Sequence, residues 1–220
     1  FGIAANIFTR ITQVKPDRAE PWNNLGMCYA GLGMNIKARN CFHEAWKREK
    51  SGMFAANIGM THFADRDFKK AIEWCERALS LGDSKSARTT LGMTYLSLGQ
   101  WEKGWEYNDS SIGGKFRKDV QFQDEPRWNG EKGKGVVFYG EQGLGDEIMY
   151  ASCIPDAQRD CRETILECDR RLQGLFSRSF PGVSVYGTRT QDGVAWPANH
   201  KIDARCPVGQ IPQFYRPTPK

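Results

Sequence analysis

The sequence predicts an α + α/β protein, in which an α-helical solenoid is followed by an α/β lobe. Two observations carry this prediction: a residue pattern with a period of 33 residues runs to about residue 112, and strand patterns alternate with helix patterns after residue 133. The chain has 220 residues, 40% hydrophobic and 26% charged, which is enough to bury two cores. That composition excludes a disordered tail, a collagen-like fibre and a disulfide mini-protein.

Three dipeptides mark the repeat, and a methionine follows each one: Leu25-Gly26, Ile58-Gly59 and Leu91-Gly92, with Met27, Met60 and Met93. A fixed period of this length is typical of helix pairs that bury their apolar faces only by stacking on their neighbours. The first 112 residues are therefore expected to form a solenoid of such pairs.

The first unit places its small and large residues at spacings that resemble the tetratricopeptide repeat family: Trp22, Leu25, Gly26, Tyr29, Ala38, Phe42 and Ala45. The third unit departs from that family, because it has Gly104 and Asn108 where alanine and a large apolar residue are expected. Upstream, Ala4, Phe8 and Pro16 fit the end of a repeat, so the chain is expected to begin inside one.

This resemblance implies a concave groove that binds a protein or peptide partner. The residues expected to line the groove are Asn23, Met27, Asn57, Met60, Phe63 and Met93. The methionines are either an adaptable binding surface or packing between adjacent helices. A clamp for a peptide carboxylate is not predicted, because lysine and arginine are missing from these positions.

A domain boundary is expected at residues 113–133, between a solenoid at 1–112 and a lobe at 134–220. The segment begins with Gly113-Gly114 and ends in turn-forming residues, which is typical of a linker. Its basic patch, 115–118, either is solvated or touches an acidic group.

The lobe is predicted to be Rossmann-like, with βαβαβ order. Strands are expected at 135–139, 164–167 and 183–186, and helices at 146–160 and 170–179. Pro155 should kink or end the first helix, because proline has no backbone N–H to donate.

The loop at 140–147 follows the first strand, where ligands bind in open parallel sheets. Its glycine spacing matches neither the dinucleotide fingerprint nor the phosphate loop of ATP-binding proteins, so neither cofactor is predicted. Asp146 begins the next helix and is either a cap of that helix or a general base.

The runs Pro126–Glu131 and Glu141–Ile148 resemble bacterial tetratricopeptide proteins with a glycosyltransferase-like domain related to the lipopolysaccharide heptosyltransferases. This resemblance implies a two-lobed GT-B fold that transfers a sugar from a nucleotide-sugar donor to a glycan acceptor, without metal or cofactor. It makes Asp146 the candidate base and the preceding loop the substrate-binding segment, with Glu141, Gln142, Gly143 and Gly145. The donor-binding lobe of that family has no counterpart before Lys220, so the 220 residues are expected to be inactive alone.

Two functions remain open: a protein-interaction module fused to an acceptor lobe, or a non-enzymatic scaffold with a degenerate lobe. The net charge of +5 includes no dense basic stripe, so nucleic acid is not an expected partner. Apolar runs are too short to span a membrane. The seven cysteines include no CxxC pair, and this favours a reducing, cytoplasmic compartment over disulfides or a metal site.

Overall fold

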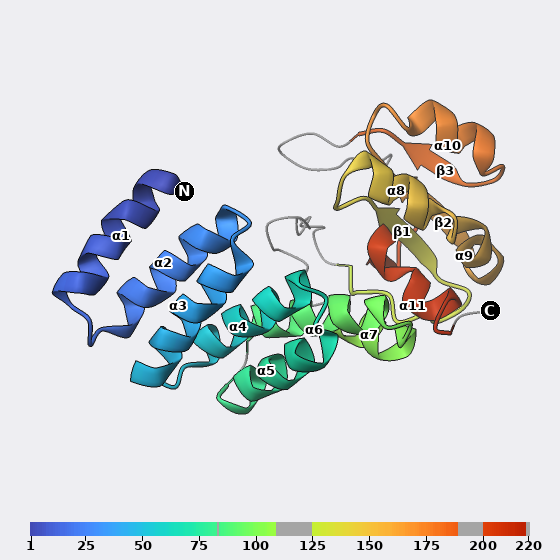
Figure 1. Ribbon diagram of the computed structural model, residues 1–220. Helices are drawn as coiled ribbons and strands as arrows, with labels where there is room; N and C mark the ends of the chain where they lie inside the picture. The colour runs from blue at the N-terminus through green and yellow to red at the C-terminus, as the bar shows by residue number, and fades with distance from the viewer. Residues whose placement is uncertain (83, 109–124, 189–199, 219–220) are drawn as a thin grey trace. The chain divides into compact units, whose positions relative to one another are not determined.

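The computed structural model describes residues 1–82, 84–108, 125–188 and 200–218. The chain divides into two compact units, Phe1–Ser111 and Ile112–Lys220 (Figure 1). Most of the predicted linker, residues 113–124 with the basic patch, lies outside the described residues.

The regular elements among the described residues of the first unit are all helices. In chain order they are α1 (Gly2–Val14), α2 (Ala19–Gly31), α3 (Asn35–Arg48), α4 (Gly52–Ala64), α5 (Phe68–Ser80), α6 (Lys85–Ser97) and α7 (Trp101–Asn108). The helices pack as successive pairs, α2 with α3, α4 with α5 and α6 with α7. This confirms the solenoid of helix pairs predicted for the N-terminal part.

Side-chain caps fix where three of these helices begin. Ser51 Oγ accepts from the backbone N–H of Met53 at 3.3 Å, ahead of α4. Asp67 and Ser84 cap α5 and α6 in the same way. Each cap satisfies an N–H group that the helix itself leaves without an acceptor.

The repeated glycines let the paired helices approach closely. A Cβ atom on Gly26 would lie 2.5 Å from the ring of Phe42, so only glycine fits beneath that side chain. Phe42 is fully buried and packs with Ala38 and Ile58, which joins the first repeat to the second. The 33-residue period thus reflects a contact that each stacked pair needs.

The second unit is organised by a parallel sheet. Its strands are β1 (Gly135–Tyr139), β2 (Glu163–Glu167), β3 (Ser184–Tyr186) and β4 (Ala204–Pro207), in the order β3-β2-β1-β4. Val137 of β1 pairs with Ile165 on one side and with Arg205 on the other. All of β1 is buried, as expected for a continuous apolar strand in the middle of a parallel sheet.

Helices cover one face of this sheet: α8 (Leu144–Ala151), α9 (Ile154–Asp160) and α10 (Gln173–Ser179) (Figure 1). The core on that face contains Phe138 and Leu166 of the strands with Ile154 and Phe176 of the helices. After β4, the short helices η2 (Val208–Gln210) and α11 (Pro212–Tyr215) follow, and η2 contacts α8.

Two predictions for this unit need correction. The helix expected over 146–160, with a kink or end at Pro155, is two helices that separate slightly earlier: α8 ends at Ala151 and α9 begins at Ile154, with Pro155 in its first turn. Three strands were expected, but β4 adds a fourth that pairs with β1. No local sequence pattern distinguishes this short strand. It forms by pairing with β1, in which Val136, the partner of Ala204, lies 68 residues earlier in the chain.

Candidate functional site

Three equivalent helices, α2, α4 and α6, carry the predicted binding residues of the first unit. Met27, Met60 and Met93 occupy the same position in each, and we call these three side chains the methionine face. Met27 is 45% exposed and Met93 is 41% exposed, whereas Met60 is half-buried. Somewhat less than half of each outer methionine is therefore accessible to solvent.

The two asparagines predicted beside the methionines contact each other. Asn57 Nδ2 donates a hydrogen bond to Asn23 Oδ1 at 2.7 Å, which links α4 to α2. Asn23 is only 6% exposed. Its amide joins two repeats, and a buried amide needs that partner, while a role of Asn23 in lining the groove stays a prediction.

Phe63 lies at the end of α4 and is half-buried. Its ring lies 6.0 Å from that of Phe68 at the start of α5. The guanidinium of Arg66 covers the Phe68 ring at 5.7 Å from its centre. Phe63 thus extends the apolar surface of α4 toward the turn between α4 and α5.

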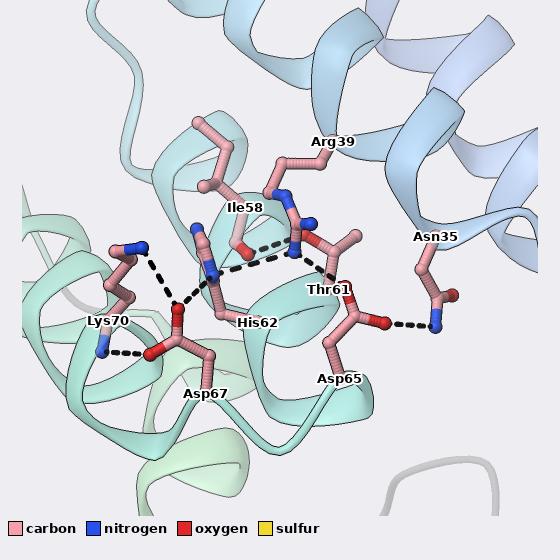
Figure 2. Close-up of polar contacts among 8 residues, drawn as sticks. All are labelled: Asn35, Arg39, Ile58, Thr61, His62, Asp65, Asp67 and Lys70. Atoms are coloured by element: carbon pink, nitrogen blue, oxygen red, sulfur yellow. Dashed lines mark hydrogen bonds and ion pairs between the residues drawn. The ribbon is translucent and has the colours of Figure 1, made fainter.

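A polar joint that the sequence analysis missed connects α3 to the C-terminal end of α4 (Figure 2). Arg39 of α3 forms an ion pair with Asp65 at 2.8 Å, and its guanidinium lies 3.5 Å from His62 Nδ1. His62 Nδ1 also lies 3.3 Å from a carboxylate oxygen of Asp67. A run of alternating charges after a helix gives a weak signal for such a joint, because its partner comes from another repeat.

The charge state of this joint follows from burial. Burial lowers the pKa of the His62 imidazole, and the nearby Arg39 guanidinium lowers it further. The hydrogen bond from Asn35 Nδ2, 3.0 Å long, lowers the pKa of Asp65. At neutral pH the joint therefore contains a neutral histidine between a cation and ionised carboxylates.

In the second unit, the structure brings the predicted substrate-binding loop to the end of β1. The backbone N–H of Gly143 donates to Asp146 Oδ2 at 3.3 Å, so the carboxylate caps the first turn of α8. Glu141 is 4% exposed and accepts a hydrogen bond from Gln142 Nε2 at 3.0 Å. Gly145 belongs to the first turn of α8 and is exposed.

The neighbouring acid, Glu147, was missed by the sequence analysis. It is 2% exposed, and its Oε2 accepts from the backbone N–H of Asp169 at 3.0 Å. This bond ties α8 to the segment after β2. A second buried polar residue, Gln210, lies in η2 beyond β4 and is 4% exposed. The sequence does not predict the burial of Glu147 or Gln210, because the burial of a helix residue depends on which segments pack against it.

The chemistry available to the cysteines is limited. None of the seven forms a disulfide, and six are buried. Burial raises the pKa of the Cys75 thiol to about 12 and those of Cys41 and Cys161 to about 11. In the part of the chain that the structure describes, no group of three or more histidine, cysteine or acidic side chains could hold a metal ion.

Residues 55–81, which span most of α4 and all of α5, match the family model of the tetratricopeptide repeat. The chain therefore contains a tetratricopeptide repeat at α4 and α5. Among the described helices, none combines the length and apolar character that crossing a bilayer requires.

Curated relatives extend the comparison beyond the repeats. Protein FlbA of Caulobacter vibrioides is 31% identical over 191 residues, which covers 80% of this chain and 31% of FlbA. That share of this chain exceeds the first unit, so the similarity continues into the second unit. The BBSome complex member BBS4 of Bos taurus is 28% identical over 110 residues, 50% of this chain and 21% of BBS4. The chain thus spans less than a third of either relative.

Among solved structures, MamA is similar at 21% identity and a TM-score of 0.44, over 49% of this chain and 64% of MamA. YrrB, described as a tetratricopeptide protein with an unusual peptide-binding site, is similar at 19% identity and a TM-score of 0.45, over 49% of this chain and 57% of YrrB.

Proposed function

We propose that this chain is a protein-interaction module that binds a peptide segment of a partner on its methionine face. The exposure of Met27 and Met93 at equivalent positions of two repeats is the observation that supports this proposal. Phe63 and Met60 lie between them along the array and add apolar surface. A surface of this kind favours apolar side chains from an extended segment, since thioethers adapt to varied shapes.

Matched glutamate variants test the proposal. Met27 and Met34 are both 45% exposed, but Met34 lies in the turn between α2 and α3, outside the methionine face. Peptides selected by phage display against the whole chain should bind Met27→Glu about tenfold or more weakly, because a buried charge would lack a partner. Met34→Glu should bind as the unsubstituted chain does.

Circular dichroism should show equal helicity and melting temperature for both variants. Equal loss of peptide affinity in Met27→Glu and Met34→Glu would contradict the proposal, as would selected peptides that bind both variants normally.

We propose as a second function that the sheet unit is the acceptor-binding lobe of a glycosyltransferase, in which Asp146 is the general base. The position of its loop supports this: β2 and β4 flank β1 on opposite sides, and ligands bind where a parallel sheet reverses its strand order. A glycan acceptor and a nucleotide-sugar donor are the substrates this proposal names. The alternative is a degenerate lobe in a scaffold protein. The absence of disulfides among the seven cysteines supports a cytoplasmic location for either function.

The variant Asp146→Asn distinguishes a general base from a helix cap. In Asp146→Asn, the side-chain oxygen still accepts the hydrogen bond from Gly143, so the melting temperature should stay within about 2 °C. Loss of the base should lower sugar-transfer turnover of the full-length protein by about a hundredfold or more. Unchanged turnover in Asp146→Asn would identify Asp146 as a cap only.

A further inference from the structure

The sulfur atoms of this chain fall into two groups with opposite accessibility. Six of the seven cysteines are buried, and burial raises the pKa of Cys75 to about 12. Buried thiols that stay protonated react slowly with oxidants, because the thiolate is the reactive form. The methionines are different: none of the six belongs to the buried core, and five are more than 40% exposed.

Two of the five exposed methionines, Met27 and Met93, belong to the methionine face together with the half-buried Met60. They lie at one position of α2, α4 and α6, and the chain keeps α2 and α4 together through the bond between Asn57 and Asn23. α4 also packs directly on α6. An oxidant in solution therefore meets the surface that we assign to binding before it meets the thiols.

We propose that Met27, Met60 and Met93 form an oxidation-sensitive site, through which a peroxide-type oxidant weakens binding at the methionine face. This inference rests on the proposed interaction function. It adds a modification, the conversion of the binding side chains to methionine sulfoxide, and names its co-reactant as hydrogen peroxide or a related two-electron oxidant.

The reaction balances without help from the protein. The thioether sulfur attacks one peroxide oxygen, the O–O bond breaks, and an S–O bond forms. The sulfur loses two electrons, and the peroxide is reduced to water after proton transfer. The product is a polar sulfoxide in place of an apolar thioether, so apolar partner side chains lose favourable contact with the surface.

Exposure predicts the order of reaction. Met27 and Met93 should react at rates within about threefold of Met34, which has nearly the same exposure but lies outside the face. Met60 should react more slowly, because it is half-buried. The fold should persist, since the buried clusters of the array contain no methionine.

Peptide mapping by mass spectrometry tests the modification on the whole chain after timed exposure to hydrogen peroxide. The expected result is sulfoxide at Met27 and Met93 while helicity by circular dichroism is unchanged. Oxidation of Met27 or Met93 more than about tenfold slower than Met34, or oxidation of Cys75 before either, would overturn the proposal.

A second measurement tests the consequence, with the apolar dye bis-ANS as the probe. Peroxide should lower dye fluorescence of the unsubstituted chain but not of a Met27→Leu, Met60→Leu, Met93→Leu variant, which keeps apolar side chains that do not oxidise. The matched control, Met34→Leu with Met149→Leu, should respond as the unsubstituted chain does. An equal response of the triple variant, or no response of the unsubstituted chain despite mapped sulfoxide, would refute the switch.

Failure of the interaction function has a separate signature. In that case the display selection yields no peptide sensitive to Met27→Glu, whereas the oxidation map and the dye response still report on the modification.

Discussion

Gly59 on α4 leaves no room for a larger side chain between the paired helices of its repeat. A Cβ atom there would lie 2.5 Å from Cys75 Sγ and 3.2 Å from the Ala71 carbonyl oxygen. Since protein interiors are close-packed, α5 would have to move away to admit even one methyl group. The glycine that marks the repeat in sequence is therefore a contact point between helices.

Substitution of this glycine should destabilise the array. We expect Gly59→Ala to lower the free energy of unfolding by about 1–3 kcal/mol, because overpacking outweighs the better helix propensity of alanine. Urea unfolding followed by circular dichroism measures the loss. Gly2→Ala is the matched control, since nothing lies within 4 Å of a Cβ atom at Gly2 in α1. If both variants unfold at the same urea concentration, the contact is less tight than the structure indicates.

Individual polar residues were the hardest to predict. Asp146 was singled out because it begins a helix, yet the buried acid of that turn is its neighbour Glu147. Asn23 was expected to face a ligand, yet it bonds to Asn57. Both outcomes depend on which segments pack together, and a residue's own type and its helix position do not determine that.

At the scale of elements, the joint between α3 and α4 joins two repeats through charge as well as apolar packing. His62 is 7% exposed and faces Arg39 of α3, while Asp67 and Lys70 approach it from the start of α5. His43 of α3 also interacts with it, and burial lowers the pKa of His43. Protonation of His62 would therefore place a second cation beside Arg39.

The pH dependence of stability follows from the direction of these shifts. The folded pKa of His62 lies below the unfolded value, so the unfolded chain binds the proton more readily. The contribution of His62 to the free energy of unfolding should therefore be complete above about pH 6.5. It should be lost as the pH falls toward the folded pKa. His62→Gln should reduce the pH dependence of the free energy of unfolding between about pH 7 and 5.5. In the double variant His43→Gln, His62→Gln, this free energy should be nearly independent of pH over the same range.

Urea unfolding at each pH measures the slope. A slope that persists unchanged in the double variant would show that other groups dominate the acid response.

Elements differ in how well sequence predicts them. β1 was predicted with its observed bounds, because five consecutive apolar or glycine residues follow a turn signal. β4 was missed, since its four residues, Ala204–Pro207, carry no strong strand pattern and gain their hydrogen bonds from β1. The break between α8 and α9 was anticipated through Pro155, but not its position.

At the scale of the whole molecule, the two units use different ways to bury apolar surface. The array stacks helix pairs, as in the cluster of Phe42 and Ile58, whereas the second unit packs helices on a sheet around Phe138. The similarity to FlbA covers more of the chain than the first unit does, so it extends into the second unit.

The sequence by itself determined the repeat period, the helix pairs, the central strand and the common position of the three methionines. These features depend on local hydrogen bonding and on the spacing of apolar residues, which are both written along the chain. Only the tertiary structure decided that Met27 and Met93 are exposed, that Asn23 is not, that Glu147 is buried, and that β4 lies beside β1. Burial and strand order depend on contacts between segments far apart in sequence, and a linear pattern does not record them.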